Sequence, residues 1–267
     1  MPATILILAG RRPGATDPLA EAHGVADKCV VPVGGQPMLA HVLRAALASG
    51  ARRVVVAAHD RALVDRVGSG LAGHERVAFI AAADNLADSV LTALVGAEFP
   101  VLVTTADACL LTPATIAEID AAARAAGADA AVALARKADV LAVHPDGQRR
   151  FYPFADVDVS NCNAYWLGTA DALRAVEAFR GGGQFIREPV RVLRAFGLVN
   201  LLRFRFGLGP LHRVFERLGG HLRLKLVPVL VSDGAAAIDV DAERSLRVTE
   251  AVMAERRGSD PALARAA

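Results

Sequence analysis

The regular alternation of short β-branched runs with alanine- and leucine-rich stretches constrains the fold of this chain more than any other feature. Five runs, at residues 5–8, 54–58, 77–81, 101–105 and 130–135, have the length and composition of buried strands. The stretches between them have helical character. When helices join consecutive strands, the strands run in the same direction. We therefore predict an α/β fold whose sheet is mostly parallel.

Proline, glycine and a capping residue mark two of the helices between these strands. Residues 37–49 begin with a proline and are followed by Gly50. Residues 113–126 repeat this pattern, with Thr112 as the N-cap and Gly127 as the stop. Proline favours the first turn of a helix and glycine the position just after its end. Both segments are therefore predicted to be helices.

The composition changes in the last third of the chain. Three glycines open the segment 181–225, which carries nine lysine or arginine residues against two acidic ones. A strand at 226–231 and a helix at 242–255 then return the chain to the sheet. We predict a single domain over residues 1–257, with 181–225 as a helical basic insertion or lid and 258–267 as a flexible tail.

The composition also excludes several function classes. The three cysteines are widely spaced and form no CxxC pair, so neither a disulfide framework nor a zinc site is expected. The chain shows no signal-peptide pattern and no apolar run of the roughly 20 residues that a membrane span requires. A net charge of +2 is too small to indicate binding to nucleic acid. We expect a soluble, cytoplasmic protein.

A loop of small and basic residues follows the first strand. It contains Gly10, Arg11, Arg12 and Gly14, and Lys28 comes shortly after it. Small residues let backbone N–H groups approach phosphate oxygens, and the basic side chains can neutralise a triphosphate. The alternative is an ordinary strand-to-helix turn whose arginines are solvated. The spacing does not fit the dinucleotide-binding fingerprint, which requires G-x-G-x-x-G at the start of a helix.

An aspartate at the end of the fourth predicted strand is the strongest single candidate for catalysis. Asp107 follows the buried run 101–105, and the ligand sites of open α/β sheets lie at the carboxyl ends of the strands. Carboxylate oxygens are the ligands that magnesium prefers. The alternative is a cap for the helix that starts at Pro113, but Asp107 lies rather far upstream for that role.

These residues resemble the MobA-like nucleotidyltransferase family, relatives of molybdenum-cofactor guanylyltransferase and of the sugar-phosphate and alcohol-phosphate nucleotidylyltransferases. In that family a leucine-alanine-glycine turn ends the first strand, and a lysine and a proline-valine-glycine-glycine-x-proline-leucine segment follow. The matching residues are Leu8, Ala9, Gly10, Lys28 and 32–39. The resemblance implies a Rossmann-like, three-layer nucleotidyltransferase fold of the GT-A-like type.

The resemblance also implies where the nucleotide binds. The loop departs from the usual glycine-x-glycine-x-arginine spacing, and we favour Arg11 over Arg12 as the phosphate ligand. Asn85 and Ser89 are four residues apart, so on a helix they share one face and can offer hydrogen bonds to the base or ribose. The alternative for Asn85 is a helix cap. The predicted nucleotide-binding residues are Leu8, Ala9, Gly10, Arg11, Arg12, Gly14, Lys28, Asn85 and Ser89.

A metal site and an acceptor site follow from the same resemblance. Asp107 matches the metal-binding aspartate of the family, and Asp239 is the second predicted ligand of Mg²⁺. Asp241 is predicted to be the N-cap of the last helix. Asn161 and Asn163 alternate on a predicted strand, so both amides can face the acceptor.

The implied reaction is Mg²⁺-dependent transfer of a nucleoside monophosphate from CTP or GTP to a small phosphorylated acceptor, with release of pyrophosphate. Asp107, Lys28 and Arg11 are the predicted catalytic residues, and Arg191 and Arg194 of the basic insertion are predicted to bind the acceptor. Two other function classes remain: a nucleotide-binding regulator with little turnover, and a protein whose insertion docks on a membrane surface or a partner. The base, the acceptor and the oligomeric state stay open.

Overall fold

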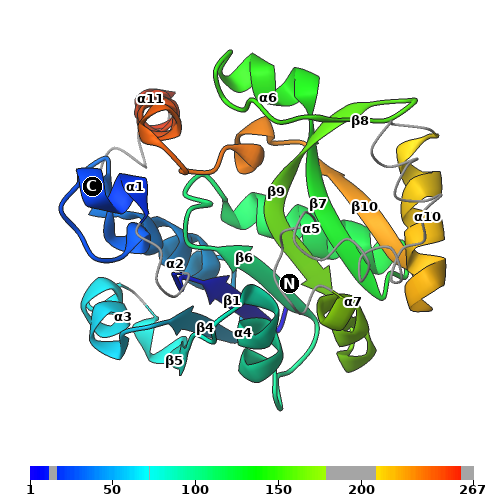
Figure 1. Ribbon diagram of the computed structural model, residues 1–267, viewed down its shortest axis with the longest axis horizontal. Helices are drawn as coiled ribbons and strands as arrows, with labels where there is room; N and C mark the ends of the chain where they lie inside the picture. Colours follow the sequence, from blue (N-terminus) through cyan, green and yellow to red (C-terminus); the bar gives the residue numbers. More distant parts are fainter. Residues whose placement is uncertain (12–16, 72, 179–208, 260–267) are drawn as a thin grey trace.

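The computed structural model describes residues 1–11, 17–71, 73–178 and 209–259, which form a central sheet with helices on both faces (Figure 1). The main sheet has the strand order β10-β7-β9-β6-β1-β4-β5, and β8 pairs with β9. The strands are β1 (Thr4–Leu8), β4 (Arg53–Ala58), β5 (Val77–Ala81), β6 (Val101–Thr105), β7 (Ala130–Arg136), β8 (Tyr152–Pro153), β9 (Asp158–Leu167) and β10 (Leu226–Val231). A separate hairpin consists of β2 (Pro32–Val33) and β3 (Gln36–Pro37).

Most neighbouring strands of the main sheet are parallel. β1 pairs in parallel with β4 and β6, β4 with β5, and β10 with β7. β9 runs antiparallel between β6 and β7. All five strands predicted in the first half of the chain are present, and the predicted strand 226–231 is β10. The prediction of an α/β fold with a mostly parallel sheet is confirmed.

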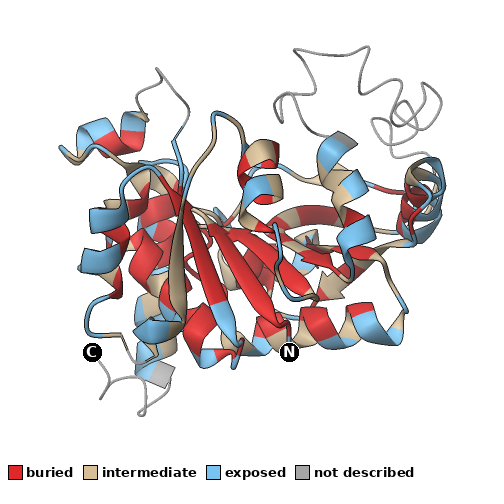
Figure 2. Cartoon of the chain, turned by 90° about the horizontal axis from the view of Figure 1, so that it is seen from below, coloured by how far each residue is buried: buried red, intermediate tan, exposed pale blue. Residues whose placement is uncertain are grey.

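The helices cover the two faces of this sheet in separate layers. On one face, Ile5 of β1 shares a core cluster with Leu43 and Ile116. On the other face, Leu6 shares a cluster with Val90. Successive residues of a strand point to opposite faces, so a strand covered on both sides is apolar throughout. Figure 2 shows the buried strands between helices whose outer surfaces are exposed. The helices are α1 (Pro18–Ala22), α2 (Met38–Ala48), α3 (Arg61–Gly68), α4 (Leu86–Ala93), α5 (Pro113–Ala125), α6 (Lys137–Val143), α7 (Leu173–Ala178), α10 (Leu211–Leu222) and α11 (Glu243–Ser259), with 3-10 turns η1 (Lys28–Val30), η2 (His74–Arg76), η3 (Ala170–Ala172) and η4 (Gly234–Ala237).

Local sequence signals explain where the two predicted helices begin and end. The hydroxyl of Thr112 accepts a hydrogen bond from the backbone N–H of Thr115 at 3.1 Å, which makes Thr112 the N-cap of α5. Gly127 follows this helix with a positive φ of 58°, a conformation that favours glycine. α2 begins at Met38, one residue later than predicted, because Pro37 belongs to β3.

The β2–β3 hairpin depends on two glycines. Gly34 and Gly35 have φ values of 57° and 82°, and a two-residue hairpin turn of this kind needs positive φ at both central positions. The backbone N–H of Gly34 donates a hydrogen bond to Oε1 of Glu250 at 2.9 Å. The hairpin therefore joins the loop after β1 to the last helix, α11.

Part of the predicted basic insertion lies within the described residues. Its end forms α10, which lies beside β10 at the edge of the sheet (Figure 1). Leu211 and Phe215 bury one face of α10 against Phe154. Residues 179–208 lie outside the described residues. α11 continues to Ser259 and so includes the first two residues of the predicted tail, and residues 260–267 lie outside the described residues. Among the described helices, none has the length and apolar character to cross a membrane.

Candidate active site

The loop after β1 lies tightly against the end of β5. A Cβ atom added to Gly10 would lie 2.7 Å from the Cβ atom of Ala82. Any residue larger than glycine at this position would therefore displace its neighbour. The backbone carbonyl of Arg11 accepts a hydrogen bond from Nε2 of His59 at 2.9 Å. Packing and this hydrogen bond hold the start of the loop at the carboxyl edge of the sheet. Arg12 and Gly14, which we predicted to bind nucleotide, lie outside the described residues.

The two predicted phosphate ligands differ in their surroundings. The Arg11 side chain is 55% exposed, and its Nε lies 3.6 Å from Oδ1 of Asp27. The side chain of Lys28 is only 20% exposed and belongs to the first residue of η1. Arg11 therefore stands at the rim of the site, whereas Lys28 is held inside it.

Lys28 connects carboxylates from two distant parts of the chain. Its Nζ donates a hydrogen bond to Oδ2 of Asp107 at 2.8 Å and another to Oδ1 of Asp241. The hydroxyl of Thr105, the last residue of β6, donates to the other oxygen of Asp107. Burial alone lowers the pKa of Lys28, but the two carboxylates raise it well above its ordinary value. Lys28 is therefore a permanent positive charge between Asp107 and Asp241.

The position of Asp241 corrects our prediction that it caps the last helix. α11 begins at Glu243, two residues further on. The backbone N–H groups of Asp241 and Ala242 instead donate to the hydroxyl of Ser245, at 2.9 and 3.1 Å. Because this serine satisfies the backbone donors, the Asp241 carboxylate is available to Lys28. Lys28 lowers the pKa of Asp241, although burial opposes the shift.

Asp239 lies beside this charge cluster and is held by two side-chain amides. Gln148 Nε2 donates to Oδ1 of Asp239, and Asn163 Nδ2 donates to Oδ2, each at 3.1 Å. Burial and the nearby negative charges of Asp241 and Asp107 raise the pKa of Asp239 to about 6. The three aspartates are thus close enough to interact, while the Lys28 hydrogen bonds go to Asp107 and Asp241.

The two predicted acceptor amides lie together on β9. Asn161 Nδ2 donates to Oδ1 of Asn163 at 2.9 Å and to the hydroxyl of Tyr165 at 2.7 Å. Asn163 has a φ of 50°, at a point where the pairing of β9 with β7 shifts register. Asparagine tolerates this left-handed conformation better than most residues do. A local irregularity of the strand therefore brings Asn163 to Asp239.

Asn85 and Ser89 have structural roles at the start of α4. Asn85 is the N-cap, and its Oδ1 accepts a hydrogen bond from the backbone N–H of Asp88 at 2.9 Å. The hydroxyl of Ser89 is buried, and it accepts a hydrogen bond from the backbone N–H of Ala83 and donates to the carbonyl of Asn85, both at 2.9 Å. The helix-cap alternative for Asn85 is therefore present. Their predicted contacts with the nucleotide stay a prediction.

The three cysteines belong to the buried core of the protein. Cys29, Cys109 and Cys162 are free and buried. Burial raises the pKa of each thiol, which disfavours the thiolate form.

A divalent cation fits the chemistry of the Lys28 cluster. The ammonium group already stands as a cation between carboxylates from two segments, Asp107 after β6 and Asp241 before α11. Within the described ranges, no group of three or more histidine, cysteine, aspartate or glutamate side chains is arranged to hold a metal ion. Magnesium is usually held by one or two protein carboxylates together with substrate phosphates. The donor set therefore matches a site that a nucleotide helps to complete.

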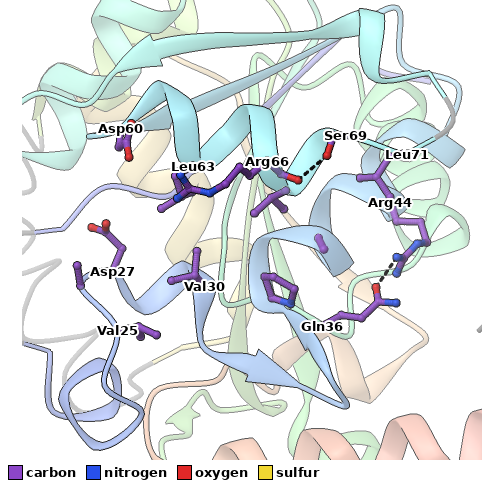
Figure 3. A pocket seen from close by; sticks show the side chains of 15 residues that line it. Val25, Asp27, Val30, Gln36, Arg44, Asp60, Leu63, Arg66, Ser69 and Leu71 are labelled. Carbon is purple, nitrogen blue, oxygen red and sulfur yellow. Dashed lines mark hydrogen bonds between the residues drawn. The ribbon is translucent and has the colours of Figure 1, made fainter.

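A cavity of about 720 Å³ lies next to this cluster but does not contain its charged groups. Figure 3 shows Asp27 and Val30 on one side of the cavity and Leu63 and Arg66 of α3 on the other. Lys28, between the first two residues in sequence, does not line it. We assign the candidate active site to the charge cluster because the groups that can bind phosphate and metal meet there.

Comparison with known proteins agrees with this fold. A family model for the MobA-like NTP transferase domain matches residues 5–195. A hypothetical transferase from Thermus thermophilus has a TM-score of 0.74 and 23% identity, over 92% of this chain and 100% of that chain. CMP:2-keto-3-deoxy-manno-octonic acid synthetase, complexed with CTP, has a TM-score of 0.56 and 15% identity, over 95% and 99% of the two chains. 2-C-methyl-D-erythritol 4-phosphate cytidylyltransferase, also from Thermus thermophilus, has a TM-score of 0.52 and 18% identity, over 94% and 98%. No curated protein matches the chain.

The fold and the family match define a nucleotidyltransferase with a three-layer, Rossmann-like architecture. The chain belongs to the MobA-like NTP transferase family. The family assignment suggested by the residues at 8–10, 28 and 32–39 is therefore confirmed.

Sequence reasoning missed three contributors to the site. Asp241 binds Lys28, Gln148 orients Asp239, and His59 holds the carbonyl of Arg11. The Ile-Asp-Val-Asp pattern offered a signal for Asp241, because two aspartates before a final helix offer two candidate ligands. Gln148 and His59 follow no pattern that distinguishes them from other polar loop residues. Arg191 and Arg194 lie outside the described residues.

Proposed function

We propose that this chain transfers a nucleoside monophosphate from CTP or GTP to a small phosphorylated acceptor and releases pyrophosphate, with Mg²⁺ as cofactor. One observation carries the proposal: Lys28 meets Asp107 and Asp241 at the edge of the sheet where the loop after β1 begins. We call this loop, which starts at Gly10, the Gly10 loop. A partly buried cation beside convergent carboxylates can bind a polyphosphate and a divalent metal together.

The reaction needs positioning and charge neutralisation more than covalent catalysis. A phosphate oxygen of the acceptor attacks the α-phosphorus of the triphosphate, and a new P–O bond forms. The bond from the α-phosphorus to the oxygen that bridges to the β-phosphate breaks, and this electron pair leaves with pyrophosphate. Lys28 and Arg11 neutralise phosphate charge during this transfer. No enzyme-bound intermediate is needed.

Asp107 and Asp239 are the proposed ligands of Mg²⁺. Asp107 lies at the end of a buried strand, and Asp239 is oriented by two amide donors. Asp241 adds a third carboxylate to the same cluster. When bound, Mg²⁺ stabilises the negative charge that develops at the α-phosphate.

The acceptor is proposed to bind beside Asp239. Asn161 and Asn163 present polar groups there, and Asn163 already donates to Asp239. Arg191 and Arg194 are proposed to contribute positive charge from a lid formed by residues 181–225. In this arrangement, residues 1–257 act as one domain, with the nucleotide over the Gly10 loop and the acceptor over β9.

A pyrophosphate-release screen tests this function. The wild-type protein is incubated with each of the four nucleoside triphosphates, with Mg²⁺ or with EDTA, and with a panel of phosphorylated alcohols, sugars and pterins. We expect Mg²⁺-dependent release with CTP or GTP and one acceptor class. Asp107→Asn keeps the size of the side chain but removes its charge, and should abolish this release. Release that persists at the wild-type rate in Asp107→Asn would place the chemistry elsewhere.

A further inference from the structure

The position between Asp107 and Asp241 is a preformed cation site. The backbone N–H of Val240 donates a hydrogen bond to the carbonyl of Asp107 at 3.1 Å, which fixes the loop before α11 against the end of β6. Ser245 holds the backbone of Asp241. Neither contact involves Lys28, so the two carboxylates converge through the backbone rather than through the lysine.

Lys28 is the movable member of this cluster. Its ammonium group is carried by a flexible four-carbon stem, whereas the carboxylates stand on short side chains. The cluster contains Asp107, Asp239 and Asp241 against one ammonium group, so it keeps an excess of negative charge. The Asp241 carboxylate is 64% exposed, which leaves one side of the cation position open to solvent.

We propose that Lys28 is the resident cation of this position in the empty enzyme, and that a divalent ion held by Asp107 and Asp239 takes over the Asp241 carboxylate as well when the triphosphate draws the lysine away. This inference rests on the proposed function. An ammonium group and a divalent ion repel each other and compete for the same carboxylate oxygens. Without nucleotide, the metal must displace a lysine that is already paired with two carboxylates.

The exchange couples the binding of metal and nucleotide. A triphosphate offers Lys28 a new set of anionic partners, and the released carboxylates then bind the metal. Coupling of this kind is reciprocal, so the metal also strengthens binding of the nucleotide. Lys28 is therefore more than a phosphate ligand: it keeps the metal site closed to free divalent ions until the substrate arrives.

The test measures the affinity for Mn²⁺ alone, without nucleotide, from the electron paramagnetic resonance signal of the free ion. Lys28→Met removes the charge and keeps the chain length. We expect this variant to bind Mn²⁺ about thirtyfold more tightly than the wild type, the factor for a unit charge and a divalent ion about 4 Å apart in bulk water. Lys28→Gln should behave in the same way, and Lys28→Arg should keep the weak binding of the wild type.

Two controls locate the effect. Lys225→Met removes a lysine that directly precedes β10. It lies where the parallel strands begin, whereas the Lys28 cluster lies where they end, so this variant should leave the Mn²⁺ affinity unchanged. In the double variant Lys28→Met with Asp241→Asn, the gain in affinity should disappear. Thermal unfolding of each variant confirms that the folded protein is being titrated.

The outcomes separate this inference from the proposed function. Equal or weaker Mn²⁺ binding by both neutral Lys28 variants overturns the exchange, and so does a gain that survives Asp241→Asn. Neither measurement requires turnover. A wild-type protein that releases no pyrophosphate with any triphosphate instead contradicts the proposed function, whichever way the Mn²⁺ comparison comes out.

Discussion

Replacement of Asp239 by asparagine should stabilise the metal-free protein at neutral pH. Its pKa is raised from 3.8 to about 6, so the folded protein holds a proton that the unfolded chain has already lost at pH 5. This difference of about two pKa units corresponds to about 3 kcal/mol. Asp239 is partly accessible to solvent, so we take 3 kcal/mol as the upper limit and expect a gain of about 1 to 3 kcal/mol at pH 7.5.

The size of the effect changes with pH in a defined window. Well below pH 3.8, Asp239 is protonated in both the folded and the unfolded state, so its ionisation takes no stability from the wild type. As the pH rises to about 6, the unfolded chain binds fewer protons than the folded protein, so the wild type loses stability. Asparagine does not titrate, and the advantage of the variant should therefore grow between pH 4 and pH 6 and stay constant above that.

Urea unfolding in the presence of EDTA, at several pH values from 4.5 to 7.5, measures this difference. Gln148→Ala is the matched control, because it removes an amide that donates to the ionised form of Asp239. It should make the loss of stability with rising pH steeper, opposite to Asp239→Asn. A free-energy difference between Asp239→Asn and wild type that stays constant with pH would refute the reasoning.

Three further predictions concern other parts of the molecule. Lys28→Ala should weaken binding of the triphosphate more than binding of the acceptor, as measured by calorimetric titration of each; equal losses would count against its role as a phosphate ligand. Gly10→Ala should lower the free energy of unfolding by about 1 to 3 kcal/mol because the new methyl group meets Ala82, whereas Gly220→Ala, with no neighbouring atom within 4 Å, should be neutral or stabilising. Burial raises the pKa of Asp120, but hydrogen bonds from Arg124 and Trp166 outweigh it and hold this pKa below its ordinary value. The stability that this carboxylate contributes should therefore be present above about pH 4 and disappear in more acidic solution. Acid unfolding of Asp120→Asn that matches the wild type would contradict this.

The predictable part of the fold was the part with strong local signals. β5 and β6 were predicted to the residue because both are short apolar runs bounded by polar or turn residues. The reversed direction of β9 had no such signal. A strand has the same side-chain pattern in either direction, and its pairing with β6 and β7 depends on the path of the connection before it.

In the candidate site, too, only the residues with a strong local signal were predictable from the sequence. Asp107 stood out in the sequence because it follows a buried strand, and in the structure it accepts a hydrogen bond from Lys28. Asp239 and Asp241 both precede the last helix, and the local sequence led us to predict a helix cap for Asp241 where the structure has a partner of Lys28. Their different partners arise from the hydrogen bond between Val240 and Asp107, which joins segments far apart in the chain.

That same hydrogen bond determines when the enzyme becomes complete during synthesis. The strands β1, β4, β5 and β6, the Gly10 loop and Lys28 all leave the ribosome early, and they pair with one another. Asp241 emerges only just before α11. Under the proposed mechanism, a growing chain therefore carries a phosphate-binding half with an unfinished cation position, and it consumes no nucleotide until its last helix has docked. Turnover would then report that both ends of the fold have found each other.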